Sequence, residues 1–74
     1  MPNIVIPDGK LSLIIEAGFS SRGSDVDNIA KPFIDILQKH YGFNDSRIYK
    51  LIIMKAIVKK GDEYIDFSLF ECWD

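Results

Sequence analysis

Apolar and polar residues alternate along residues 11–20, which predicts a half-buried β-strand. The apolar side of this strand comprises Leu11, Leu13, Ile15, Ala17 and Phe19. The preceding segment, residues 2–9, contains two prolines and a glycine turn, so we expect it to be irregular. The small polar residues at 20–24 predict a loop after the strand.

A helical period follows over residues 28–41. Apolar side chains recur there at spacings of three and four and form one stripe, made of Ile29, Phe33, Ile36, Leu37 and Tyr41. Asp27 or Asn28 is a suitable N-cap for this helix. Gly42 suits the position that follows the last turn, because glycine adopts the left-handed conformation found there.

Two further strands are predicted after the helix. Residues 47–60 are rich in β-branched side chains, which favours a strand over a helix, and residues 63–73 form the last strand. Gly61 and Asp62 between them predict a hairpin turn. The order strand, helix, strand, strand predicts an α+β fold with a small mixed sheet and one main helix. We expect the first two strands to be parallel and the last two to be antiparallel.

The second of these three strands is apolar on both faces, although one helix can cover only one face of a sheet. One face carries Ile48, Ile52, Met54 and Val58, and the other carries Leu51, Ile53 and Ile57. A second copy of the chain is the simplest cover for the remaining face, so we expect a homodimer.

The length and composition of the chain support this expectation. We expect residues 1–74 to form one domain, and domains this short often need a disulfide, a metal or a partner chain for stability. Cys72 is the only cysteine and His40 the only histidine, which excludes an intrachain disulfide and is too little for a structural zinc site. The counts of 9 Lys and Arg against 11 Asp and Glu give a net charge of −2. That balance argues against attraction of nucleic acid by bulk charge but allows a local basic patch.

The sequence shows neither a membrane span nor an export signal. The longest apolar run falls short of the roughly 18 residues that cross a bilayer. Residues 1–10 lack the basic and apolar regions of a signal peptide. With a lone cysteine, these features favour a reducing cytoplasm and no membrane partner.

Carboxylates gather around the start of the predicted helix. Asp25 and Asp27 flank one residue where the loop enters the helix, so an extended approach points both to one side. Asp27, Lys31 and Asp35 follow one another at four-residue spacing, away from the apolar stripe. If the turn with Asp45 folds back beside the helix start, three carboxylates and one ammonium converge. Such a cluster suits Mg²⁺ or Mn²⁺, which activates water and stabilises charge on a phosphoryl oxygen.

Each of these residues also has an ordinary structural explanation. Asp25 and Asp27 suit the positive end of a helix dipole, and Asp45 suits a turn. Lys31 and Asp35 suit a surface ion pair. The pattern alone therefore leaves two interpretations open, a metal site and a non-catalytic dimeric module that binds protein or nucleic acid.

The order of residues in this segment resembles the RusA family of Holliday-junction resolvases. The shared string reads D-x-D-N-x-x-K-P-x-x-D-x-L, followed by G-F, an Asp-Ser turn and a lysine ten residues beyond the turn aspartate. In this chain the string comprises Asp25, Asp27, Asn28, Lys31, Pro32, Asp35 and Leu37, followed by Gly42, Phe43, Asp45, Ser46 and Lys55. The similarity covers residues 25–55, and neighbours such as Asn28 and Pro32 agree as well as the acids.

The resemblance implies a magnesium-dependent, homodimeric endonuclease that resolves four-way DNA junctions by paired nicks during recombination and repair. It implies that Asp25, Asp27 and Asp45 hold the metal and that Lys31 takes part in catalysis, with Asn28 and Asp35 in support. Candidate DNA contacts are the basic residues Arg22, Lys50, Lys55, Lys59 and Lys60, whose ordinary interpretation is a solvated face. Small resolvases of this type are often encoded by phages, so the resemblance also favours a phage origin and action in a bacterial host.

The chain also differs from the family in ways that bear on DNA affinity and substrate range. Family members are usually longer before the first strand and are often basic. Asn44 stands where the family commonly has the first of two adjacent acids. The catalytic pattern itself is retained.

Overall fold

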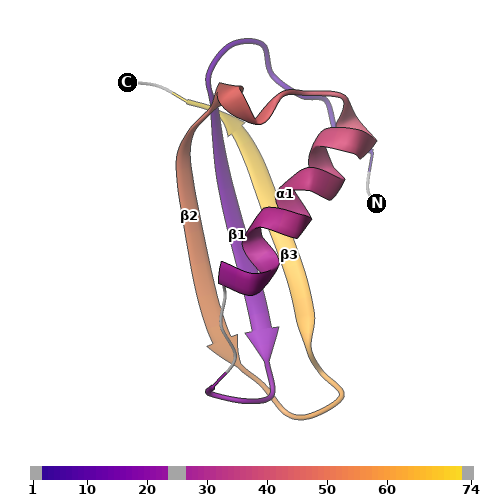
Figure 1. Ribbon diagram of the computed structural model, residues 1–74, viewed down its shortest axis with the longest axis vertical. Coiled ribbons are helices and arrows are strands. Elements are labelled where there is room, and N and C mark those ends of the chain that lie inside the picture. The colour runs from indigo at the N-terminus through magenta and orange to yellow at the C-terminus, as the bar shows by residue number, and fades with distance from the viewer. Residues whose placement is uncertain (1–2, 24–26, 73–74) are drawn as a thin grey trace.

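A computed structural model describes residues 3–23 and 27–72, with Asp27 described by its backbone alone. The elements are β1 (Leu11–Phe19), α1 (Asp27–Tyr41), the short 3-10 helix η1 (Asp45–Arg47), β2 (Ile48–Ile57) and β3 (Tyr64–Glu71). In this part of the chain they form a three-stranded mixed sheet with one α-helix across one face (Figure 1). The expected α+β fold class is confirmed. α1 is neither long nor apolar enough to span a membrane.

β1 is the central strand of the sheet. It pairs in parallel with β2 and antiparallel with β3, so the order across the sheet is β2-β1-β3. The expected parallel pairing of the first two strands is confirmed. The expected hairpin between the last two strands is wrong, because β2 and β3 lie at opposite edges and residues 58–63 cross from one edge to the other past the end of β1 (Figure 1).

Burial and chain length explain this crossing. The helix-facing side chains of β1 are the most deeply buried, and Leu11, Leu13 and Ile15 are 0% exposed, which a central position allows. At an edge, β2 exposes Lys50 and Lys55 to solvent. The six residues from 58 to 63 can reach about 20 Å when extended, whereas two strand spacings amount to only about 10 Å.

The core lies between the sheet and α1. Its buried members are Leu11, Leu13, Ile15, Leu37 and Phe43, and partly buried side chains pack around them, namely Ile6, Phe33, Ile34, Tyr41, Ile48, Phe67 and Leu69. The rings of Phe33 and Phe67 meet edge to face with centroids 5.7 Å apart, which ties α1 to β3. Ile36 is 51% exposed, so the predicted apolar stripe is wrong at that position. Ile36 lies about 100° around the helix from the buried Leu37.

An irregularity at the start of β2 changes which residues share a face. Leu11 pairs with Ile48 and Ser12 pairs with Lys50, so Tyr49 is left over. Ile48 therefore packs against the core under α1. The prediction that grouped Ile48 with Ile52 and Met54 on one face is wrong, because an extra residue in a strand reverses the alternation.

Hydrogen bonds fix both ends of the segment that follows α1. Gly42 has φ +73° and donates its N–H to the carbonyl of Gln38 at 2.8 Å, so its predicted place after the last turn is confirmed. Arg47 donates to the carbonyls of Gly9, at 2.9 Å, and Pro7. These bonds hold the N-terminal segment beside the start of β2.

Candidate functional site

Four of the five predicted DNA-contact residues lie at one end of the molecule, which we call the loop end. β1 and β2 are parallel, so both strands stop at the same end of the sheet. The segments that follow them, residues 20–23 and 58–63, therefore leave the sheet at that end (Figure 1). The loop end contains Arg22, Lys55, Lys59 and Lys60. Lys50 lies toward the other end of the sheet, opposite Ser12. The loop end therefore concentrates positive charge that the sequence spreads over 39 residues.

Lys55 joins the two segments of the loop end. Its Nζ donates to the carbonyl oxygen of Arg22 at 2.7 Å and lies 5.6 Å from the centre of the Phe19 ring. The N–H of Val58 also donates to the carbonyl of Phe19 at 2.8 Å. Lys55 thus fixes the chain just after β1, and its predicted contact with DNA stays a prediction.

The loop end also contains acids. Glu63 accepts a hydrogen bond from the N–H of Gly61 at 2.7 Å. The pKa of Glu63 is lowered by hydrogen bonds that its carboxylate accepts from the Ser20 hydroxyl, from the N–H of Glu63 itself and from the N–H of Gly61. Glu63 is therefore a structural acid that closes the 58–63 loop against residue 20.

A stripe of polar residues, exposed at Lys31 and Asp35, runs along α1. Asp27, Lys31, Asp35 and Gln38 succeed one another at spacings of four, four and three, and the side chains of Lys31 and Asp35 are exposed. Gln38 Nε2 donates to Asp35 Oδ1 in a long contact of 3.4 Å, and Gln38 Oε1 accepts from the N–H of Asp45 at 2.9 Å. Gln38 therefore joins Asp45 to the stripe. Sequence reasoning missed Gln38, although its place three residues after Asp35 was a usable signal.

Asp45 lies beside the second half of α1. Its N–H contacts Gln38, which follows Asp27 by eleven positions, or about 16 Å along a helix axis. η1 sits at the upper end of the sheet, whereas α1 begins in the lower half (Figure 1). The turn thus lies away from the helix start, so the condition under which the sequence predicts convergence of the three acids is not met.

The predicted metal ligands are described only in part. Asp25 lies outside the described residues, and the side chain of Asp27 is not described. In residues 3–23 and 28–72, no three His, Cys, Asp or Glu side chains gather closely enough to hold a metal ion. An ion shared by Asp25, Asp27 and Asp45 stays a prediction.

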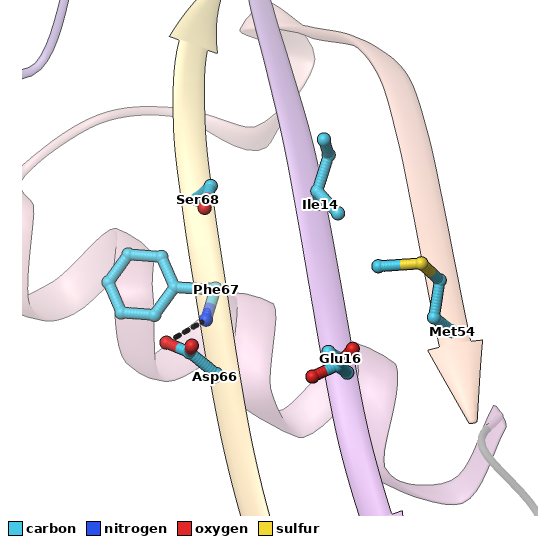
Figure 2. Close-up of a pocket in the computed structure, with 6 residues that line it drawn as sticks. All are labelled: Ile14, Glu16, Met54, Asp66, Phe67 and Ser68. Carbon is cyan, nitrogen blue, oxygen red and sulfur yellow. Dashed lines mark hydrogen bonds between the residues drawn. The ribbon is translucent and has the colours of Figure 1, made fainter. Parts of the chain in front are cut away.

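A second polar cluster, which sequence reasoning missed, lies on the sheet face opposite α1. We call this the open face; it is formed by Ser12, Ile14, Glu16, Gly18, Lys50, Ile52, Met54, Ala56, Tyr64, Asp66, Ser68 and Phe70. Glu16 and Asp66 are paired across β1 and β3, and they line a shallow hollow of about 190 Å³ with Ile14, Met54 and Ser68 (Figure 2).

Tyr64 is tied to this cluster. Its hydroxyl donates to Glu16 Oε2 at 2.9 Å. This hydrogen bond is the main reason that the pKa of Tyr64 is raised, and desolvation and the negative charges of Glu16 and Asp66 act in the same direction. This hydrogen bond joins β3 to β1, because Tyr64 lies on β3 and reaches an acid on β1.

Comparisons of the chain with protein-family models, with curated proteins and with solved structures found no match. The resemblance to RusA resolvases therefore depends on the residue order within 25–55. The structure adds the placement of the described part of that segment, with Lys31 and Asp35 on one exposed helix stripe and Asp45 attached to it through Gln38.

Proposed function

We propose that the chain is a metal-dependent, structure-selective endonuclease that resolves four-way DNA junctions by paired nicks. The observation that carries this proposal is the order of residues 25–55, with a D-x-D string entering α1 and Lys31 one turn later. The attachment of Asp45 to the same helix stripe through Gln38 supports it.

Three acids would hold Mg²⁺, with Mn²⁺ as an alternative. Asp25, Asp27 and Asp45 carry the hard oxygen donors that these ions prefer, and Asp45 would reach an ion held by the other two once its turn moves from the second half of α1 toward the helix start. The bound ion supplies Lewis-acid stabilisation of negative charge on a phosphoryl oxygen. Asp45 keeps its carboxylate exposed, because its contact with Gln38 uses the backbone N–H alone.

Lys31 is the proposed catalytic cation. Its side chain is exposed one helical turn after Asp27, so its ammonium can approach a phosphate bound beside the helix start. A positive charge there offsets charge that develops on the phosphate in the transition state or orients the attacking water. Asp35 has a supporting role, because it accepts from the same Gln38 that holds Asp45. Asn28 is assigned a supporting role by the resemblance alone.

The loop end is the proposed surface for the DNA backbone. Arg22, Lys59 and Lys60 are exposed there. Phosphate contacts of this kind position a protein on DNA without reading sequence, which suits an enzyme that selects a branched shape. The fifth basic candidate, Lys50, lies away from this end on the open face.

The proposed enzyme acts as a homodimer. A four-way junction presents two equivalent strands for cleavage, and a two-fold symmetric dimer presents two equivalent active sites to them. Symmetry thus gives a physical reason for paired nicks.

A nicking assay tests this proposal. We expect a synthetic four-way junction with each strand labelled in turn to be cut on two opposing strands in Mg²⁺ and to stay intact with a chelator. A linear duplex of the same sequence controls for general nuclease activity. Failure to nick the junction in Mg²⁺ and in Mn²⁺, with protein shown to bind it, would refute the nuclease.

The position of Asp45 favours a second candidate function. Because Asp45 lies beside the second half of α1, the acids in this second proposal serve only as a helix cap and a turn, in a non-catalytic dimeric module that binds protein or nucleic acid. For such a module, junction binding would be independent of Mg²⁺ and no strand would be cut. The same assay, run with a binding measurement, separates the two functions.

A further inference from the structure

The open face presents apolar side chains to solvent. α1 lies on the other side of the sheet, so in the part of the chain that the structure describes no helix covers the open face (Figure 1). Ile52 is 38% exposed, Met54 44% and Phe70 50%. They come from both edge strands and flank Ile14 of β1, so the apolar surface spans the width of the sheet. Contiguous exposed apolar surface marks interaction sites in water-soluble domains.

The charged groups beside this apolar surface are mainly acidic. Glu16 and Asp66 are paired across β1 and β3 and line the hollow of about 190 Å³. Among the residues that form the open face, Lys50 alone is basic, and Glu71 lines a second hollow of about 270 Å³ together with it. The surface therefore combines apolar contact area with net negative charge.

This charge disfavours several surfaces that could cover the face. DNA and anionic lipid headgroups would place phosphates against Glu16 and Asp66. A second copy packed face to face would bring the acids of both chains into one interface, with Lys50 of each chain as the only base on the two faces. The homodimer of the proposed nuclease would then use another surface. A basic amphipathic segment of a protein supplies both the opposite charge and the apolar contact that this face lacks.

The dimensions of the open face fit one α-helix. The axes of β2 and β3, which flank β1, lie about 10 Å apart, which is close to the diameter of a helix with its side chains. β1 has nine residues and is about 30 Å long, the length of a helix of about 20 residues. On the other side of the sheet α1 shows that a single helix packs across these strands (Figure 1). A helix on the open face would complete a three-layer arrangement, a common solution for covering both sides of a sheet.

The rows of the open face also match the spacing of side chains on a helix. Ile14 and Ile52 share one row, and Glu16 and Asp66 share the next, two residues or about 6.6 Å farther along β1. Helix residues four apart are separated by about 6 Å along the axis. An apolar side chain above the first row therefore places a side chain one turn away above the two acids. A lysine or arginine at that position can pack its stem on apolar surface and bring its charge to the carboxylates.

We infer that the open face binds a basic amphipathic α-helix of a partner protein, with apolar side chains against Ile14 and Phe70 and a lysine or arginine at the acidic hollow. The inference goes beyond the proposed nuclease, because this surface lies apart from the residue string that carries the nuclease proposal and its interaction needs neither DNA nor metal.

Two designed peptides test this inference by NMR titration, without DNA or metal. The basic peptide is a helix of about 20 residues, the length given by β1, with leucines along one stripe and lysines one turn from them. The acidic peptide has glutamate at each lysine position. We expect the basic peptide to shift the amide signals of Ile52, Met54 and Phe70 and to leave those of Lys31 and Asp35, on the exposed side of α1, in place. The acidic peptide should bind at least about tenfold more weakly.

Substitutions on the face locate the contact. Asp66→Lys should raise the Kd of the basic peptide at least about tenfold, and Lys50→Glu should lower it. Asp62→Lys is the matched control, because it makes the same charge change at an exposed acid of the loop end and should leave the Kd nearly unchanged. Circular dichroism establishes that each variant is folded. Phe70→Ala changes no charge and should also weaken binding, which keeps the test decisive if Asp66→Lys fails to fold.

Several outcomes would overturn the inference. Equal binding of the two peptides, equal effects of Asp66→Lys and Asp62→Lys, or shifts confined to α1 would each do so. Shifts of the open-face amides when the chain alone is diluted would assign the face to a second copy, and shifts on addition of duplex DNA would assign it to nucleic acid. Loss of nicking by a chain that still binds the basic peptide would count against the nuclease alone.

Discussion

The ring of Tyr64 lies directly over Gly18, its partner across β1 and β3. A Cβ atom at position 18 would overlap the Cδ1 and Cε1 atoms of that ring. Glycine thus leaves room for an aromatic side chain to cover the open face and to reach Glu16 with its hydroxyl. The contact couples the packing of the sheet to the acid cluster on its surface.

Gly18→Ala should displace the Tyr64 ring and break its hydrogen bond to Glu16. We expect the midpoint of urea unfolding to fall, because the ring loses its place against β1 and its hydrogen bond to Glu16. Urea unfolding of Gly18→Ala, Tyr64→Ala and the double variant forms the test. Because both single changes remove the same contact, the double variant should lose less than the sum of the two. Strict additivity would show that the ring and Gly18 are not coupled.

Tyr64 should titrate above the ordinary pH range of tyrosine. Its pKa is raised in the folded chain, so the hydrogen bond contributes stability at pH values below the ordinary tyrosine pKa, which is about 10. That contribution is lost as the pH rises through the folded-state pKa. Glu16→Gln should lower the pKa of Tyr64, as followed by the ultraviolet absorption of phenolate. The chain has 3 tyrosines, so Tyr64→Phe serves to identify the signal.

Glu63 should make the fold sensitive to acid. Its pKa is lowered in the folded chain, so its hydrogen bonds contribute stability above the ordinary glutamate pKa of about 4.3. This contribution is lost as the pH falls below that value and through the folded-state pKa. Ser20→Ala removes the largest cause and should move the pKa upward in an NMR titration of the carboxyl carbon. An unchanged Glu63 pKa in that variant would exclude the Ser20 contact.

Local patterning was sufficient to predict the elements of the fold but not their order in the sheet. The alternation at Leu11, Leu13 and Ile15 correctly predicts β1 and its buried face, and Gly42 correctly marks the end of α1. The central position of β1 could not be predicted, because a glycine turn at 61 suits a hairpin and a crossing loop equally well. Which edge β3 joins is decided by burial across the whole sheet.

In the candidate site, too, the sequence predicts what depends on local spacing but not the contacts between residues that are distant in sequence. Spacing correctly places Lys31 and Asp35 together on an exposed helix stripe, because helical periodicity is local. The position of Asp45 depends on where the chain after Gly42 meets the helix, and the side chain of Gln38 decides that. The pairing of Glu16 with Asp66 joins residues 50 apart in sequence, and no local pattern carries that information.

Asp45→Asn should abolish cleavage and leave junction binding intact or tighter. The amide keeps the shape of the carboxylate but is a weaker ligand for a hard cation, and it removes a negative charge that repels phosphate. The bond from the Asp45 N–H to Gln38 is a backbone contact, so the turn should be retained. Single-turnover nicking and a binding titration measure the two effects, with Asp62→Asn as a control for the loss of an exposed acid. Full activity in Asp45→Asn would make Asp45 a turn residue only.

Lys31→Ala should lower the cleavage rate far more than it lowers DNA affinity. If Lys31 acts in the transition state, the single-turnover rate at saturating protein should fall roughly a hundredfold, as for loss of one electrostatic donor. If it only contacts a phosphate, the loss should appear in binding, with the salt dependence reduced by about one unit of slope.

Lys39→Ala, at an exposed lysine in the last turn of the same helix, is the matched control and should change neither quantity appreciably. Lys31→Arg keeps the charge but replaces a compact ammonium with a planar fork, so partial rescue would indicate that charge matters more than shape. Wild-type cleavage by saturating Lys31→Ala would remove Lys31 from the mechanism.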